Sequence, residues 1–163
     1  MQGLFTKEQE ELIERVDALV FSSVSKRAAE LDAKCEFPDA DFKDLHREGL
    51  LMATLPEKDG GLGLGFDGHD PLSFFLIIER LARGNASTAH CFQVHSNAAQ
   101  ITRAFGTDEQ VKRFLEPTRV AGHLLVGAGS EPGGGRAGTV AKKVKGGMSI
   151  TGVKGSPRFQ CNK

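Results

Sequence analysis

The chain has 163 residues, with 21 Lys and Arg against 21 Asp and Glu, so its formal net charge is zero. A chain of this length can bury about 70% of its unfolded surface as one ordinary domain. The lack of a basic excess argues against a nucleic-acid partner, and the longest apolar run, Phe74 to Ile78, is too short to span a bilayer.

The first predicted element is a long amphipathic helix. Thr6 followed by Gln9 forms a capping box. Apolar residues then recur at spacings of three and four: Leu12, Ile13, Val16, Leu19, Val20, Val24, Ala28 and Leu31. The helix should end before Phe37-Pro38, because a residue that precedes proline avoids helical angles.

A short second helix fits Asp39 to Glu48, with Phe42 and Leu45 facing inward and Gly49 as its C-cap. The next stretch, Leu50 to Phe66, is predicted to begin as an extended apolar segment and to end as a glycine-rich loop. Its glycines at 60, 61, 63 and 65 do not fit the dinucleotide-binding fingerprint.

Asp70-Pro71 provides an N-cap and a first helical residue. The helix that follows is largely apolar and should stop at Gly84. Its apolar residues are Leu72, Phe75, Leu76, Ile78, Leu81 and Ala82. A helix that is apolar on most sides is predicted to lie at the centre of a bundle.

Two further helices complete the predicted bundle. Ser87 can cap the first of them, which carries Phe92, Ala98, Ala99, Ile101 and Phe105 and ends at Gly106. Thr107 with Gln110 forms a second capping box for the last helix, whose apolar face is Val111, Phe114 and Leu115 and which should stop at Pro117. The first 120 residues are therefore predicted to form a bundle of about five helices.

Two strand-type runs follow, Thr139 to Lys145 and Met148 to Val153. Gly146-Gly147 lies between them, which is a strong signal for a β-hairpin. A lone hairpin is marginal in water, so we expect an incomplete antiparallel β-domain in the front part of a larger protein. The predicted fold class is mainly α, with a helical domain over residues 1–120 and the beginning of a β-domain over residues 121–163.

The two parts are joined by residues 123–139, HLLVGAGSEPGGGRAGT, which we call the glycine-rich segment. After the strand-type run Leu124–Val126, the next nine residues contain five glycines and one proline. Such a bare backbone can approach a flat or charged ligand closely, although a surface connection without a ligand accounts for the same pattern. Gly133, Gly135 and Gly138 fit G-x-G-x-x-G, but they lead into a hairpin and not a helix, which argues against a Rossmann fold.

The cysteines and histidines do not predict a metal site. Cys35, Cys91 and Cys161 are widely spaced without a CxxC pair, which argues against a disulfide framework and fits a reducing cytoplasm. Cys91 and His95, close to His90, have the i, i+4 spacing of metal ligands, but no third ligand is evident. Core packing with satisfied polar atoms is the favoured interpretation.

In their order along the chain, four stretches resemble the N-terminal half of the acyl-CoA dehydrogenase superfamily. They are FPDADFKDLHREGLLMATLPEKDGGLGL, IIERLARGNASTAHCFQVHS, FGTDEQVKRFLEP and GSEPGGG, and the resemblance covers residues 4 to about 155. It implies an all-helical N-terminal domain, a middle antiparallel β-domain and a C-terminal four-helix bundle, working with FAD.

The resemblance also implies a cofactor site in the glycine-rich segment. In the family, a T-E-P-G-x-G-S loop lies against the isoalloxazine ring of FAD, where its hydroxyl and backbone amides bond the flavin. The matching residues here are Ala128, Gly129, Ser130, Glu131, Gly133 and Gly135, with Ser130 at the hydroxyl position. Arg136 and Ala137 depart from the family's Ser-Asp pair.

The activity implied by the resemblance is α,β-dehydrogenation of an acyl-CoA-like substrate by a homo-oligomeric full-length protein. The family's catalytic base comes from the C-terminal bundle, so we assign no catalytic residue here and expect no turnover from this chain alone. A flavin-dependent monooxygenase of the same superfamily is an alternative, since Arg136 and an inward His95 would suit protonation of a flavin hydroperoxide. A non-catalytic remnant or interaction domain is a third, and it would show no flavin absorbance.

Overall fold

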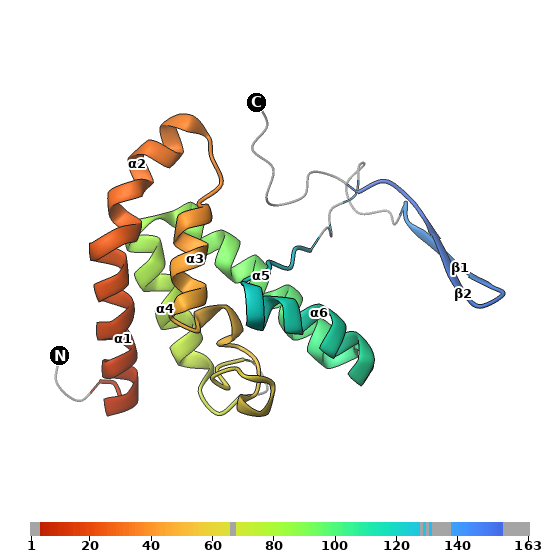
Figure 1. Ribbon diagram of the computed structural model, residues 1–163, viewed down its shortest axis with the longest axis horizontal. Coiled ribbons are helices and arrows are strands. Elements are labelled where there is room, and N and C mark those ends of the chain that lie inside the picture. Colours follow the sequence, from red (N-terminus) through yellow and green to blue (C-terminus); the bar gives the residue numbers. More distant parts are fainter. Residues whose placement is uncertain (1–3, 66–67, 128, 130, 132–137, 155–163) are drawn as a thin grey trace.

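The computed structural model describes residues 4–65, 68–127, 129, 131 and 138–154. In chain order its elements are α1 (Lys7–Leu19), the π-helical segment η1 (Val20–Val24), α2 (Ser25–Lys34), α3 (Asp39–Arg47), the 3-10 turns η2 (Leu50–Met52) and η3 (Glu57–Asp59), α4 (Pro71–Gly84), α5 (Ala86–Phe105), α6 (Asp108–Ala121), β1 (Val140–Val144) and β2 (Gly147–Thr151). Figure 1 shows the helices gathered into one bundle and the two strands beyond it. The predicted fold class, a helical bundle followed by the start of an antiparallel β-domain, is confirmed.

The predicted first helix is continuous from α1 through η1 to α2. Its N-terminus is the expected capping box, in which the Thr6 hydroxyl accepts from the Gln9 N–H and the Gln9 side chain accepts from the Thr6 N–H. A π-helical stretch at Val20–Val24, which the apolar pattern does not reveal, interrupts the α-helical register. The helix ends at Cys35, in a left-handed conformation with φ of 51°, shortly before the proline that was expected to stop it.

The start of the segment after α3 was predicted wrongly. Phe42 and Leu45 of α3 are buried as predicted, and Gly49 ends the helix with a φ of 71°. The following Leu50–Met52 is a 3-10 turn and not an extended segment. All three of its side chains are buried, and a short apolar run that is buried on every side carries no period that distinguishes a turn from a strand.

Helix α4 occupies the central position that its composition predicts. It packs against α1, η1, α2 and α5, and it begins at Asp70, whose carboxylate accepts from the Ser73 N–H at 3.2 Å. Phe74, Ile77 and Leu81 are buried in the core. Leu72 and Phe75 remain about half exposed, at 48% and 53%, so one apolar side of α4 is uncovered.

The cap predicted for α5 was wrong by two residues. Asn85, and not Ser87, is the N-cap, and its side-chain oxygen accepts from the N–H groups of Ser87 at 3.0 Å and Thr88 at 3.3 Å. Asparagine is as good an N-cap as serine, and the helix begins two residues earlier than predicted.

Helix α6 starts at the predicted capping box of Thr107 and Gln110, but it does not stop at Pro117. It continues to Ala121 and ends at Gly122, where φ is 68°. A proline inside a helix forfeits one backbone hydrogen bond. Here the turn around it is held by the buried side chains of Leu115 and Thr118.

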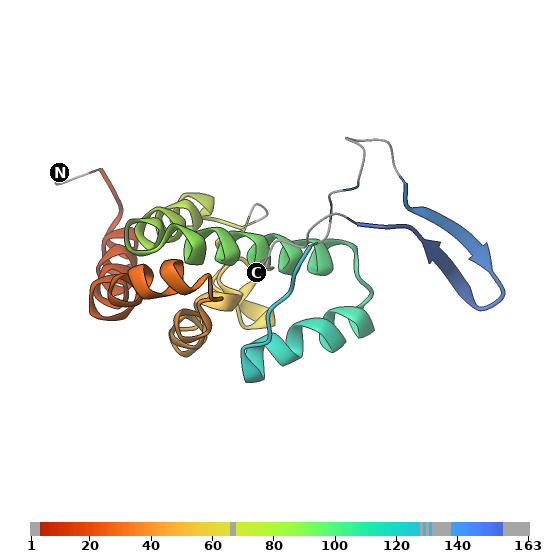
Figure 2. The same ribbon diagram turned by 90° about the horizontal axis from the view of Figure 1, so that it is seen from above.

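The core forms a larger cluster among α1, α3, α4, α5 and η2, and a smaller one beneath α6. The smaller cluster consists of Met52, Leu55, Ala99 and Leu115, with Val111 and Leu125 packed against it. Figure 2 shows α6 alongside α5 at this place. The residues just after α6 are thus anchored to the bundle.

A buried ionic network joins α2, α3 and α5. The Asp41 side chain is fully buried and accepts from Arg27 Nε at 2.7 Å and from the Thr88 hydroxyl at 2.6 Å. Arg27 Nη2 also donates to Asp44 at 2.6 Å. This network fixes the first half of the chain against α5.

The hairpin is confirmed near its predicted position. Strands β1 and β2 pair antiparallel from Val140 opposite Thr151 to Val144 opposite Gly147, and the turn residue Gly146 has a φ of 85°. Every residue of the two strands is exposed, and the hairpin stands apart from the helices (Figures 1 and 2). Among the described residues, no helix combines the length and apolar character that crossing a membrane requires.

Candidate functional site

The glycine-rich segment leaves the end of α6 and leads into β1. Of the six residues predicted to contact a cofactor, Gly129 and Glu131 belong to the described part of the chain. Ala128, Ser130, Gly133 and Gly135 lie outside the described residues. The geometry of the site therefore comes from residues 123–127, from Gly129 and Glu131, and from the base of the hairpin.

The chain leaves α6 in a fixed direction. The buried Thr118 hydroxyl donates to the His123 carbonyl oxygen at 2.7 Å, and the His123 N–H donates to the Pro117 carbonyl oxygen at 3.3 Å. Gly122 lies against the ring of His46, since a Cβ at this glycine would stand 3.0 Å from His46 Cγ. Thr118 belongs to no motif, so the sequence did not identify it as a residue of the site.

His95 makes the next contact with the segment. Its side chain is fully buried, with Nε2 3.0 Å from the Leu51 carbonyl oxygen and Nδ1 2.9 Å from the Leu125 backbone nitrogen. A carbonyl oxygen can only accept and an N–H can only donate, so Nε2 carries the hydrogen and Nδ1 accepts. Burial lowers the pKa of His95 below its ordinary value, which agrees with a neutral ring.

The predicted core role of His95 and Cys91 is confirmed. Both ring nitrogens of His95 are occupied by backbone groups, while Cys91 is buried and its burial raises the thiol pKa to about 11. His90 of the same helix is exposed. Across residues 4–65, 68–127 and 138–154, no three His, Cys, Asp or Glu side chains gather closely enough to hold a metal ion.

Gly127 and Gly129 present open backbone. A Cβ placed on either residue would meet no atom within 4 Å, and neither residue has a positive φ. Both are exposed, as is Val126, which keeps 48% of its surface. The space beside the backbone of these two glycines is therefore not filled by the described residues.

The Glu131 side chain is engaged within the chain. Its carboxylate accepts from the N–H groups of Gly138 and of Thr139, the latter at 3.3 Å, and pairs with Lys154 Nζ at 2.5 Å. The hydrogen bond from Lys154, followed by those from Thr139 and Gly138, lowers the pKa of Glu131 to about 2. Glu131 thus connects the glycine-rich segment to the residues just before β1 and just after β2, at the base of the hairpin.

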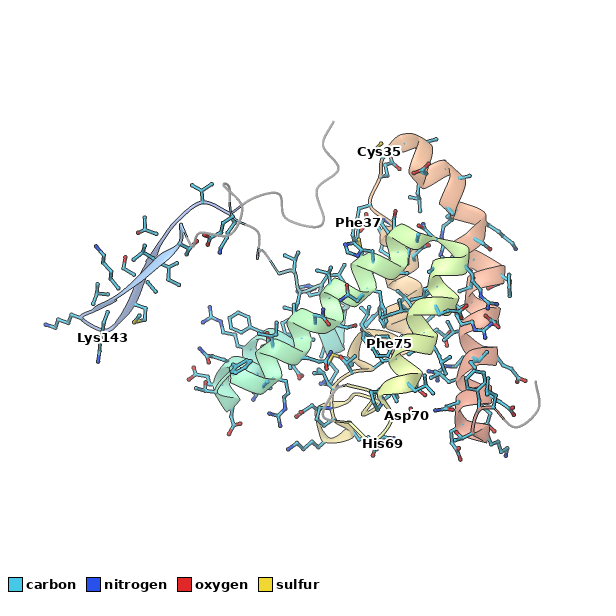
Figure 3. All side chains as sticks on the ribbon, turned by 180° about the vertical axis from the view of Figure 1, so that it is seen from behind. Cys35, Phe37, His69, Asp70, Phe75 and Lys143 are labelled. Atoms are coloured by element: carbon cyan, nitrogen blue, oxygen red, sulfur yellow. The ribbon has the colours of Figure 1, made fainter. Side chains whose placement is uncertain are left out.

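A hollow of about 590 Å³ lies elsewhere on the bundle. It is lined by the stretch from Thr54 to Glu57, by Gly63 and His69, and by Gln100, Arg103 and Ala104 of α5, among others. None of the described residues between 123 and 139 belongs to its lining. Figure 3 shows His69 beside Asp70 at the start of α4, well apart from Lys143 near the tip of the hairpin.

Comparisons with known proteins identify the family of the helical part of the chain. The family model described as "Acyl-CoA dehydrogenase, N-terminal domain" matches residues 6–120. The short-chain specific acyl-CoA dehydrogenase of Bos taurus is 33% identical over 110 residues, which cover 66% of this chain and 25% of the relative. The isovaleryl-CoA dehydrogenase of Oryza sativa subsp. japonica is 32% identical over 160 residues, which cover 93% of this chain and 37% of the relative.

Among solved structures, the butyryl-CoA dehydrogenase of Megasphaera elsdenii superposes with a TM-score of 0.70 and 27% identity, over 83% of this chain and 35% of that one. The chain spans between 25% and 37% of the length of these three relatives.

Proposed function

Because the chain belongs to the acyl-CoA dehydrogenase family through its N-terminal domain, we propose that its glycine-rich segment binds the isoalloxazine ring of FAD. The whole protein would then oxidise an acyl-CoA thioester between its α and β carbons. The relatives named for short-chain, isovaleryl and butyryl acyl groups support a substrate of this class.

The observation that carries the proposal is the open backbone at Gly127 and Gly129. A flavin ring is planar, so it needs a surface that no side chain interrupts, and a Cβ added at either glycine would meet nothing within 4 Å. The segment is also held at both ends, by Thr118 and His95 where it leaves α6 and by Glu131 at the hairpin. A bare surface held in this way fits a flavin ring.

The residues predicted to contact the cofactor would bind the flavin ring through backbone amides and one hydroxyl. Ala128 and Gly129 offer backbone amides, and Ser130 offers a hydroxyl, to the edge of the ring where negative charge gathers on reduction. Gly133 and Gly135 would keep the loop compact, as the resemblance to the family implies. FAD, when bound, supplies the acceptor for the hydride, while this chain orients the ring and excludes water from one of its sides.

The side chain of Glu131 takes a different part from the one its motif position implies. Because its carboxylate already bonds Gly138, Thr139 and Lys154, we propose that Glu131 holds the loop in shape and that any contact with FAD is made by its backbone. This division leaves the flavin contacts to amides and to the Ser130 hydroxyl.

The monooxygenase alternative receives no support from His95. A group that protonates a flavin hydroperoxide must give up a proton at the site, whereas His95 is fully buried and uses both ring nitrogens on Leu51 and Leu125. A non-catalytic interaction domain is the competing proposal, and it differs in predicting no contact with flavin. The widely spaced cysteines support a reducing compartment such as the cytoplasm.

The test is a titration of the ¹⁵N-labelled chain followed by NMR, with FAD, FMN and ADP as separate ligands. FAD and FMN share the isoalloxazine ring, whereas ADP shares only the adenine half of FAD. We expect FAD and FMN to shift the amides of Val126, Gly127 and Gly129 and ADP to leave them unchanged. If all three ligands leave these amides unchanged at millimolar concentration, or if ADP shifts them equally, the proposal is wrong.

A further inference from the structure

We propose that His95 is a positioning residue for the flavin-facing loop, a role that rests on the function proposed above. Its imidazole holds the backbone of Leu125 and so sets the direction in which Val126 and Gly127 leave the helical bundle. The sequence draws attention to His95 through its spacing from Cys91, but no motif marks this positioning role, because both of its partners are backbone groups.

The geometry makes His95 a bridge between two parts of the chain. On one side Nε2–H donates to the Leu51 carbonyl oxygen of η2 at 3.0 Å, and on the other Nδ1 accepts from the Leu125 N–H at 2.9 Å. Leu51 is 1% exposed and His95 is fully buried, so the bond between them is shielded from bulk water, whereas the bond from Leu125 is partly buried. The ring therefore fixes the backbone of Leu125 relative to the buried backbone of Leu51.

Leu125 is the right place for such control. Its side chain packs against the smaller core cluster, and only Val126 separates it from the open backbone that begins at Gly127. An extended chain advances about 3.3 Å per residue, so Gly127 and Gly129 lie at most about 7 Å and 13 Å along the chain from Leu125. A displacement of Leu125 would therefore also displace these two glycines. A planar ring stacked on that backbone would lose contact if the glycines moved by only a small part of that distance.

Asparagine and glutamine separate the two bonds of His95. The side-chain oxygen of asparagine lies close to the position of histidine Nδ1, so His95→Asn keeps an acceptor for the Leu125 N–H and loses the bond to Leu51. The amide nitrogen of glutamine lies close to the position of Nε2, so His95→Gln keeps a donor for Leu51 and loses the bond to Leu125. Each variant removes one hydrogen bond, and both leave a polar amide in the same place.

Two measurements distinguish these variants, amide hydrogen exchange and FAD titration. We expect hydrogen exchange of the Leu125 amide to be at least about tenfold faster in His95→Gln than in His95→Asn, which should stay close to wild type. We also expect the FAD-induced shifts of Gly127 and Gly129 to require several-fold more FAD in His95→Gln than in His95→Asn. Equal exchange and equal FAD dependence in the two variants would overturn the proposal.

The two proposals fail separately. Wild-type chain that shows the protected Leu125 amide but no FAD-induced shifts would contradict the flavin function and, with it, the role of the loop. FAD-induced shifts that are the same in both variants, despite different Leu125 exchange, would contradict only the positioning role of His95.

A measurement on the unmodified chain guards against variants that do not fold. The hydrogen bond from Leu125 to His95 Nδ1 should give a through-bond ¹⁵N–¹⁵N coupling between the two nitrogens. Its detection is the expected result, and its absence from a well-resolved spectrum of the folded chain would overturn the proposal.

Discussion

Replacing Asp41 by alanine should destabilise the helical bundle by about 3 kcal/mol. Removing one partner of a buried ion pair generally costs about 3–5 kcal/mol, because the remaining charge and donors lose their partner. Asp41 is fully buried between Arg27 and Thr88, which places it in this range. Arg27, however, is 31% exposed and keeps Asp44 at 2.6 Å, so we expect the lower end.

Asp41→Asn is the matched variant. It preserves the volume of the side chain and one acceptor oxygen, but it removes the charge that Arg27 pairs with. We therefore expect a loss of about half that of Asp41→Ala. Glu30→Gln serves as the control, because its ion pair with Lys34 joins two exposed side chains on one face of α2.

Urea unfolding followed by helical circular dichroism measures these differences. The free energy of unfolding should fall by about 2 kcal/mol per molar urea. The unfolding midpoint should therefore fall by about 1.5 M in Asp41→Ala and by about 0.7 M in Asp41→Asn. The Glu30→Gln midpoint should stay within about 0.3 M of wild type. A shift of less than about 0.5 M in Asp41→Ala would refute the reasoning, since it would mean that the buried network contributes little.

The remaining predictions concern titratable groups. The pKa of Glu131 is about 2, below its ordinary 4.5, so its hydrogen bonds should be complete above pH 4.5 and be lost as the pH falls through about 2. The Thr139 amide shift should follow this loss in an NMR titration, and a midpoint near 4.5 would mean that the carboxylate is not held as described. Cys35 is exposed, whereas burial raises the pKa of Cys91 to about 11, so a thiol reagent at pH 8 should label Cys35 before Cys91, as read by peptide mass spectrometry. Equal labelling rates of the two thiols in the folded chain would contradict the buried position of Cys91.

Features that depend on a few neighbouring residues could be predicted from the sequence. The two capping boxes, at Thr6 and Thr107, and the cap at Asp70 are each defined within four residues and lie where they were predicted. The hairpin is equally local, because two glycines between strand-type runs leave few other conformations.

Features that depend on distant contacts could not be predicted in this way. The helix that passes through Pro117 does so because Leu115 and Thr118 are buried against other elements, which no local rule describes. Likewise, Leu50–Met52 is an apolar run that fits a strand as well as a turn. Its conformation is determined by packing against the helices that enclose it.

The candidate site shows the same division. The glycine-rich composition of residues 123–139 is visible in the sequence, and it suffices to predict an open backbone at Gly129. What holds that backbone is a pair of long-range contacts, from His95 to Leu125 and from Glu131 to Lys154. These pairs are 30 and 23 residues apart, and neither spacing carries a signal.

The most direct test of the central claim, that the bare backbone at Gly129 contacts a flavin ring, is the affinity of Gly129→Val for FMN by NMR titration. A side chain at Gly129 meets no atom of the described chain and no unfavourable φ, so the fold should be unaffected. Gly147→Val is the control, because Gly147 is equally open but lies in the hairpin. We predict the same unfolding midpoint for both variants, together with a loss of FMN affinity of at least about tenfold in Gly129→Val alone. Unchanged FMN affinity in Gly129→Val would contradict the claim.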